Sequence, residues 1–170
     1  GGFLTRIEGS RQMTDEHTGA STRTSKLIGA GPQELYAAFL DPAALVEWLP
    51  PGGMTGVIHE WDVRVGGGYR MSLFYSPDER SIRGKTCDRE DMVKVRFLEL
   101  APPRRIVEAV SFVTADPAFF GEMTLTVTFE EVPGGTEVTL AFTNLPPGLR
   151  AEDNEAGSQL SLQQLARRFE

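Results

Sequence analysis

The hydrophobic period of this chain changes twice along its length, and this order constrains the fold more than any other feature. Two short segments with helical spacing, each begun by a proline, come first. Residues 56–145 then show a period close to two, and residues 153–170 return to a helical period. The pattern predicts an α+β fold in which a C-terminal helix closes over a curved antiparallel sheet and leaves a cavity between them.

The composition and net charge of the chain disfavour nucleic acids and membranes as partners. The 170 residues suffice for one domain with a sizeable core, and the formal net charge of -7 disfavours nucleic acid, because phosphate binding relies on Lys and Arg. No apolar run reaches the ~18 residues of a membrane span, and we find no signal-peptide pattern. Cys87 is the single cysteine, which fits a reducing compartment. We expect a cytoplasmic protein that binds neither nucleic acid nor membranes, as a monomer or homodimer.

Residues 1–20 are predicted to be a flexible tail, and the domain is expected to span residues 21–170. The polar stretch after Met13 has no periodicity and cannot bury enough apolar surface to fold. We expect Met13 to be the natural start, with an added or upstream extension before it. His17 lies in this tail and is expected to be solvated.

Two short helices are predicted after a first strand at Ser21–Ile28. Pro32 suits the first turn of a helix, and an apolar stripe continues from there to Phe39. Asp41 is expected to end this helix and to cap the next one, which carries Trp48. The prolines and glycines at 50–53 then turn the chain toward the sheet.

Alternation predicts which side chains of the next two strands face inward. The inward residues of the first strand are expected to be Val57, His59, Trp61, Val63 and Val65. Those of its hairpin partner, beyond the turn at glycines 66–68, are expected to be Tyr69, Met71, Leu73 and Tyr75.

The hydrophobic period also predicts which side chains of the remaining strands and of the last helix face inward. Val93, Val95 and Phe97 are expected to alternate inward, and a bulge is expected near Leu98. Ile106–Val113, apolar on both faces, is expected to be a central strand whose orientation periodicity leaves open. The inward residues of the last two strands are expected to be Met123, Leu125, Val127, Phe129, Val138, Leu140 and Phe142. The inward stripe of the final helix is expected to be Ser158, Leu162, Leu165, Ala166 and Phe169, with Leu160 on the opposite side.

Several short motifs, in their order and spacing, resemble a known superfamily. They are Asp41–Trp48, Gly66–Met71, Phe97–Ile106, Gly134–Thr139 and Glu155–Gly157. Together they resemble the SRPBCC (START-like) superfamily, in particular the branch related to the activator of Hsp90 ATPase homologue 1 (AHSA1-like).

This resemblance implies a helix-grip fold with an apolar cavity between the sheet and the C-terminal helix. Members of this superfamily bind lipids, hormones or polyketides, some catalyse cyclisation or related reactions, and the eukaryotic co-chaperones contact Hsp90, so the resemblance alone leaves the function open. Many relatives carry a bulky aromatic residue just after the helix glycine, whereas this chain has Ser158. If the positions are equivalent, the cavity of this chain is roomier.

The sequence contains no complete catalytic, metal or cofactor motif. Gly84-Lys85-Thr86 is similar to the end of a phosphate-binding loop, but Glu79 stands where that loop needs a glycine, and the residues that follow read as a polar connection and not as a helix. We therefore expect no cofactor and no bound metal.

Two ionisable residues have an open role. His59 is either a hydrogen-bonded core histidine, the commoner case, or a general base. Glu108 is either a surface charge, the alternative we slightly favour, or an enclosed carboxyl with a raised pKa that donates a proton or holds a cationic ligand.

Three functions remain open, and we favour binding of an apolar or aromatic small molecule. The residues predicted to contact it are Trp48, His59, Trp61, Tyr69, Met71, Glu108, Val110, Phe112, Leu125, Ser158 and Leu162. The first alternative is a protein-interaction domain of the co-chaperone type that uses its acidic outer face and has a cavity filled by its own side chains. Leu160 is a candidate exposed anchor for it, although a lone surface leucine is the commoner interpretation. The second is a cyclase- or hydrolase-like enzyme that uses His59 or Glu108.

Overall fold

A curved antiparallel sheet forms the body of the protein. The structure is a computed structural model that describes residues 19–75 and 90–170. Within these residues, seven strands pair in the order β2-β8-β7-β6-β5-β4-β3, so that β6 is central as predicted. The strands are β2 (Thr22–Ile28), β3 (Thr55–Trp61), β4 (Gly68–Phe74), β5 (Glu90–Ala101), β6 (Arg105–Phe112), β7 (Glu122–Val132) and β8 (Gly135–Thr143).

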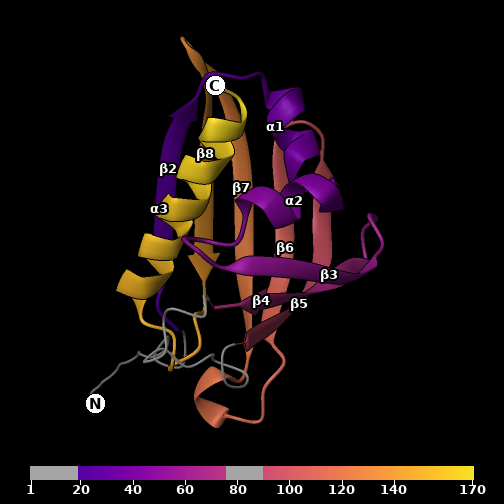
Figure 1. The fold of residues 1–170 in the computed structure, drawn as a ribbon, viewed down its shortest axis with the longest axis vertical. Helices are drawn as coiled ribbons and strands as arrows, with labels where there is room; N and C mark the ends of the chain where they lie inside the picture. Colours follow the sequence, from indigo (N-terminus) through magenta and orange to yellow (C-terminus); the bar gives the residue numbers. More distant parts are fainter. Residues whose placement is uncertain (1–18, 76–89) are drawn as a thin grey trace, which may run out of the picture.

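The helices lie on one side of this sheet. They are α1 (Pro32–Phe39), α2 (Pro42–Trp48) and α3 (Ala151–Arg168), with a short 3₁₀ turn, η1 (Pro117–Phe119), between β6 and β7. Figure 1 shows α3 lying along β2 and β8, while β3 and β4 cross the view at the other end of the bent sheet. This arrangement confirms the predicted helix-grip fold. The predicted start of the last helix was two residues too late, and η1 was not predicted.

Side chains satisfy backbone groups at the starts of both short helices. The Asp41 carboxylate accepts a hydrogen bond from the backbone N–H of Ala43 at 3.1 Å, so that it caps α2 as expected. At the start of α1, Glu34 accepts one from the backbone N–H of Gly31 at 3.1 Å. A capping side chain of this kind contributes about 1 kcal/mol to the stability of its helix.

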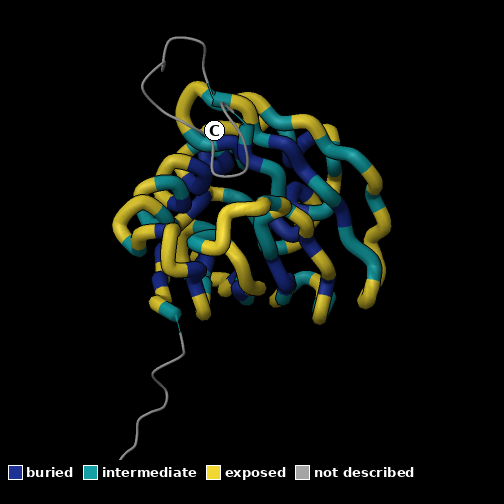
Figure 2. The backbone as a smooth tube through the Cα atoms, turned by 90° about the horizontal axis from the view of Figure 1, so that it is seen from below, coloured by how far each residue is buried: buried dark blue, intermediate teal, exposed yellow. Residues whose placement is uncertain are grey.

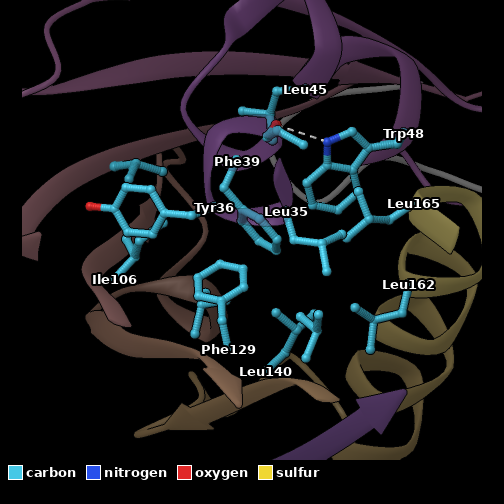
Figure 3. Close-up of a cluster of buried hydrophobic side chains, with 14 of the residues drawn as sticks. Leu35, Tyr36, Phe39, Leu45, Trp48, Ile106, Phe129, Leu140, Leu162 and Leu165 are labelled. Atoms are coloured by element: carbon cyan, nitrogen blue, oxygen red, sulfur yellow. Dashed lines mark hydrogen bonds between the residues drawn. The ribbon is translucent and has the colours of Figure 1, made fainter. Parts of the chain in front are cut away.

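A closed aromatic core fills the space between α1, α2, β7 and the C-terminal half of α3 (Figure 3). The ring of Phe39 meets Trp48 at 4.6 Å and Phe129 at 5.3 Å, both edge to face. The Trp48 indole N–H donates to the Ala38 carbonyl at 3.0 Å, which satisfies its buried polar atom. Leu162 and Leu165 of α3 are 1% and 0% exposed here, as the helical stripe predicts.

Polar contacts attach α3 to the end of α2. The Ser161 hydroxyl donates to the Leu49 carbonyl at 2.6 Å, and the Gln164 side-chain amide donates to the carbonyls of Trp48 and Pro50 at 2.7 and 2.8 Å. These carbonyls belong to the last residue of α2 and the two residues that follow it, and the carbonyls at a helix C-terminus lack an intrahelical donor. The contacts therefore fix the position of α3 against the α2 segment.

The predicted inward face of β3 is wrong at Val57 and His59, whereas Trp61 packs against the core as expected. The register of β3 against β4 shifts between Ile58 and Trp61, and Glu60 has a φ of 22° at this point. Ile58 pairs with the buried Met71 and packs against the core, whereas Val57 is 47% exposed. A bulge adds a residue to one strand, so strict alternation cannot continue across it. Val63 and Val65, also predicted to face inward, lie beyond the strand and are exposed.

Other local predictions are confirmed. The β5 register shifts between Phe97 and Glu99, at the bulge expected near Leu98. The glycine run that precedes β4 forms a turn, in which Gly66 has a φ of +90°. A side chain at Gly68 would overlap the Val95 carbonyl, so the close approach of the two backbones requires glycine there. Leu160 is 42% exposed on the outer side of α3.

Buried residues gather in the interior, and exposed residues follow the outside of the sheet and the loops (Figure 2). The predictions for the tail (residues 1–18, with Met13 and His17), for the Gly84–Thr86 segment and for Cys87 lie outside the described residues. Among the helices that the structure describes, none combines the length and hydrophobicity needed to span a bilayer.

Candidate functional site

A pocket of about 250 Å³ lies between the N-terminal half of α3 and the concave face of the sheet. Its apolar wall comes mainly from strands β4 to β8 and includes Met71, Val110, Phe112, Leu125 and Leu140. The exposed residue Asp153 belongs to its lining, so the pocket reaches the surface beside the first turn of α3.

The space is open because α3 presents small side chains at this end. Gly157, Ser158 and Ser161 face the pocket, and Ser158 is only 7% exposed. One turn further on, Leu162 and Leu165 fill the equivalent space against the sheet. The position of Ser158 agrees with the expectation that a small side chain there leaves room beneath the helix.

The structure brings together a large part of the predicted contact set. The predicted residues that line the pocket are Tyr69, Met71, Glu108, Val110, Phe112, Leu125 and Ser158. Four other residues of the predicted set do not line the pocket: Trp48, His59, Trp61 and Leu162. Trp48 and Leu162 instead belong to the closed core, and Trp61 stacks on Tyr69 with ring centroids 4.8 Å apart.

His59 lies on the outer face of β3 rather than in the pocket. It shares that face with Val57, and its Nε2 atom forms a hydrogen bond with the Ser72 hydroxyl at 2.9 Å. Ser72 is 1% exposed and therefore closed to a substrate. The interpretation of His59 as a hydrogen-bonded histidine agrees with this contact, and no dyad with Glu108 forms.

Glu108 faces the pocket, which overturns the surface position that we slightly favoured. The residue lies on central strand β6 between Phe97 of β5 and Leu125 of β7, and it is 5% exposed. Within the described part of the chain, no hydrogen bond or ion pair reaches its carboxyl group. Because burial penalises the charged form, the pKa of Glu108 is raised from 4.5 to about 7.

Tyr69 and Asp91 are the other buried polar residues of the sheet wall. Burial, and then the charge of Glu108, raise the pKa of the Tyr69 hydroxyl well above 10.0, so Tyr69 is a neutral hydrogen-bonding group at physiological pH. Asp91 is 3% exposed and accepts a hydrogen bond from the Tyr75 hydroxyl at 2.8 Å.

Sequence reasoning missed two parts of the pocket lining, namely Asp91 and the connection between α2 and β3. Asp91 has the same parity as the predicted inward residues Val93 and Val95, so extending their alternation by one step would have found it. Leu49, Pro51 and Met54 line the pocket from the α2–β3 connection, where no periodic signal exists. The described residues contain no group of His, Cys, Asp and Glu side chains able to hold a metal ion.

Comparison with known proteins identifies similar chains. Residues 30–170 match the family model described as Activator of Hsp90 ATPase homolog 1-like protein. A crystal structure of a Chromobacterium violaceum protein is 32% identical, with a TM-score of 0.77 over 87% of this chain and 95% of that chain. No curated protein matches.

Two further solved structures support the fold alone. The AHSA1 protein from Silicibacter pomeroyi is 19% identical, with a TM-score of 0.70 over 88% of this chain and 97% of that chain. The AHSA1-like protein from Aeromonas hydrophila, solved in solution, is 17% identical, with a TM-score of 0.65 over 87% of this chain and 90% of that chain.

Proposed function

We propose that this chain, which belongs to the Activator of Hsp90 ATPase homolog 1-like family, binds a small, largely apolar molecule in the pocket beneath the N-terminal half of α3. The observation that carries the proposal is an apolar pocket with one buried carboxyl group, Glu108, that lacks a partner among the described residues. Ligand sites in proteins combine these two features, since apolar walls supply affinity and a few polar groups fix orientation.

The size of the pocket sets the size of the ligand. An apolar cavity of about 150 Å³ admits benzene, and this pocket measures about 250 Å³. A single aromatic ring with a short side chain therefore fits. Burial of such a molecule against Val110, Phe112 and Leu125 contributes roughly 25 cal/mol per Å² of apolar surface removed from water.

Glu108 is the polar group that orients the ligand. A buried polar atom without a hydrogen bond costs about 1–3 kcal/mol, and a ligand that contacts the carboxyl group recovers this cost. The Tyr69 hydroxyl, which lines the same pocket, is a second group available for hydrogen bonding.

The proposal is tested by titrating the ¹⁵N-labelled protein with propylbenzene and following backbone amide shifts. Saturable shifts are expected for pocket residues such as Leu125 and Val110. Ser158→Phe, which fills the pocket from α3, is expected to abolish them. Leu160→Phe makes the same addition on the exposed side of the same helix and is expected to leave binding unchanged. Equal binding to both variants, or the absence of saturable shifts in the unaltered protein, would contradict the proposal.

A protein-interaction function of the co-chaperone type is the second candidate. It is supported by the name of the family and by the exposed Leu160 on the outer side of α3. Its test is the ATPase rate of purified Hsp90 with and without this protein. An increase that Leu160→Ala removes would favour this function, and an unchanged rate would remove it.

A further inference from the structure

The geometry points to an apolar amine as the ligand class of this pocket, with its ammonium group held against the Glu108 carboxylate. This inference rests on the proposed binding function and deepens it. It follows from the distribution of charge between the two faces of the sheet.

Among the described residues, the ionisable side chains that line the pocket are acidic groups and one tyrosine. They are Tyr69 from β4, Asp91 from β5, Glu108 from β6 and Asp153 from α3. The described lining residues of β7, β8, α1 and the α2–β3 connection include no ionisable side chain, and no Lys, Arg or His belongs to the described lining as a whole. The carboxylates of Glu108 and Asp153 therefore attract a cation into this pocket and repel an anion.

The same strands hold their arginines on the opposite face. Arg70 of β4 pairs with Glu60 at 3.0 Å, and Arg105 of β6 pairs with Glu99 at 2.8 Å. Arg96 of β5 pairs with the exposed Glu122 at 3.2 Å. These arginines alternate with inward residues along each strand, so none of them is available to neutralise Glu108.

Glu108 is the group that selects the ammonium. It is 5% exposed and has no hydrogen-bond or ion-pair partner among the described residues. An unpaired carboxylate in such a place is strongly disfavoured, whereas an ion pair with a bound ammonium compensates part of the desolvation cost. A neutral ligand leaves the Glu108 carboxyl group protonated, and a carboxylate ligand would bring a second negative charge next to it.

Amine binding through Glu108 should depend on pH in a way that binding to a merely apolar site does not. The pKa of Glu108 is about 7 in the free protein, so below that pH the ammonium must displace a proton from the carboxyl group before it can pair. Only about a tenth of the carboxyl groups are ionised one unit below the pKa, so the affinity for an amine is expected to fall about tenfold between about pH 8 and about pH 6. A neutral ligand favours the protonated form, so its affinity is expected to stay level or rise as the pH falls.

The test uses three probes of matched shape, measured by titration calorimetry at about pH 8 and about pH 6. Phenethylamine carries the ammonium, propylbenzene replaces it with a methyl group, and phenylpropanoate replaces it with a carboxylate. Phenethylamine is expected to bind about tenfold more tightly than propylbenzene at the higher pH, and phenylpropanoate is expected to bind most weakly.

Two matched variants identify the group responsible. Glu108→Gln is expected to remove both the preference for phenethylamine and its pH dependence while propylbenzene still binds, which shows that the pocket is intact. Glu131→Gln, the same change at an exposed position of β7, is expected to leave all affinities unchanged.

The outcomes separate this inference from the function on which it rests. If propylbenzene binds but phenethylamine binds no more tightly, or if phenylpropanoate binds best, the amine inference is overturned and the binding function stands. The same holds if phenethylamine binds Glu108→Gln as tightly as the unaltered protein. If none of the three probes binds, both are overturned.

Discussion

The two halves of α3 lie on the same sheet, yet one half closes a core and the other roofs a pocket. In the C-terminal half, Leu162 and Leu165 meet the aromatic residues that α1, α2 and β7 provide. In the N-terminal half, Gly157 and Ser158 face strands β4 to β8 across open space. The size of the α3 side chains therefore determines where the space between α3 and the sheet is filled and where a pocket remains.

The comparison also separates stability from function. A well-packed core stabilises the fold because each fully buried large apolar side chain contributes roughly 1.5–3 kcal/mol. A pocket forgoes that contribution, and Glu108 adds a cost because its charged form is buried. The closed half of α3 can thus hold the fold while the open half remains available for a ligand.

The largest expected effect lies in the closed half. Leu165→Ala is expected to lower the free energy of unfolding by about 3 kcal/mol, because Leu165 is 0% exposed and its removal leaves a cavity. Urea denaturation monitored by circular dichroism measures this value. Leu160→Ala, the same change on the exposed side, is expected to cost under about 0.5 kcal/mol. Similar losses for both variants would contradict the described packing of α3.

The next effect lies in the open half and depends on pH. The pKa of Glu108 in the folded protein, about 7, exceeds its ordinary value of 4.5, so the folded state holds the proton more tightly than the unfolded state. The contribution of Glu108 to stability therefore falls as the pH rises from about 4.5 to about 7 and is level above that. Glu108→Gln is expected to stabilise the protein by about 3 kcal/mol at about pH 8 and to have little effect at about pH 4.5.

Denaturation of the two proteins across this pH range provides the measurement, and Glu131→Gln is its control. A constant difference between Glu108→Gln and the unaltered protein at every pH would show that Glu108 titrates normally.

A smaller effect should follow from making the open half resemble the closed half. Ser158→Phe adds an aromatic side chain above the pocket, and its burial is expected to raise the free energy of unfolding by about 1 kcal/mol, less than full burial because part of the pocket remains unfilled. Thermal unfolding measures the gain. Loss of stability in Ser158→Phe, with Leu160→Phe unchanged, would mean that the space beneath Ser158 is already filled.

The smallest effect concerns the outer end of the closed half. Arg168 near the end of α3 pairs with Glu47 of α2, and both side chains are substantially exposed. Exposed ion pairs contribute little, so Glu47→Gln is expected to change the free energy of unfolding by under about 0.5 kcal/mol. A loss above about 1 kcal/mol would show that the polar rim, and not only the apolar core, holds α3 in place.

Sequence periodicity predicted the closed half well. The stripe through Leu162 and Leu165 is a direct consequence of helical spacing, and the inward residues of β7 and β8 follow from strict alternation. The helix start at Pro32 and the cap at Asp41 likewise depend only on local sequence. Such features are predictable because each is determined within a few residues of the chain.

The open half was predicted less completely, since its geometry depends on contacts between distant segments. The bulge in β3 reversed the expected faces of Val57 and Ile58 and moved His59 to the outside. Glu108 lies on a strand that is apolar on both faces, so its direction is decided by pairing with β5 and β7 rather than by period. Neither pairing register is encoded locally in the strand itself.

The most direct test of the account is a map of intermolecular nuclear Overhauser effects between propylbenzene and the methyl groups of the protein. The account predicts contacts with Val110 and Leu125 beneath the N-terminal half of α3, and none with Leu162 or Leu165. Contacts with the aromatic core, with the outer surface, or with no methyl group at all would contradict it.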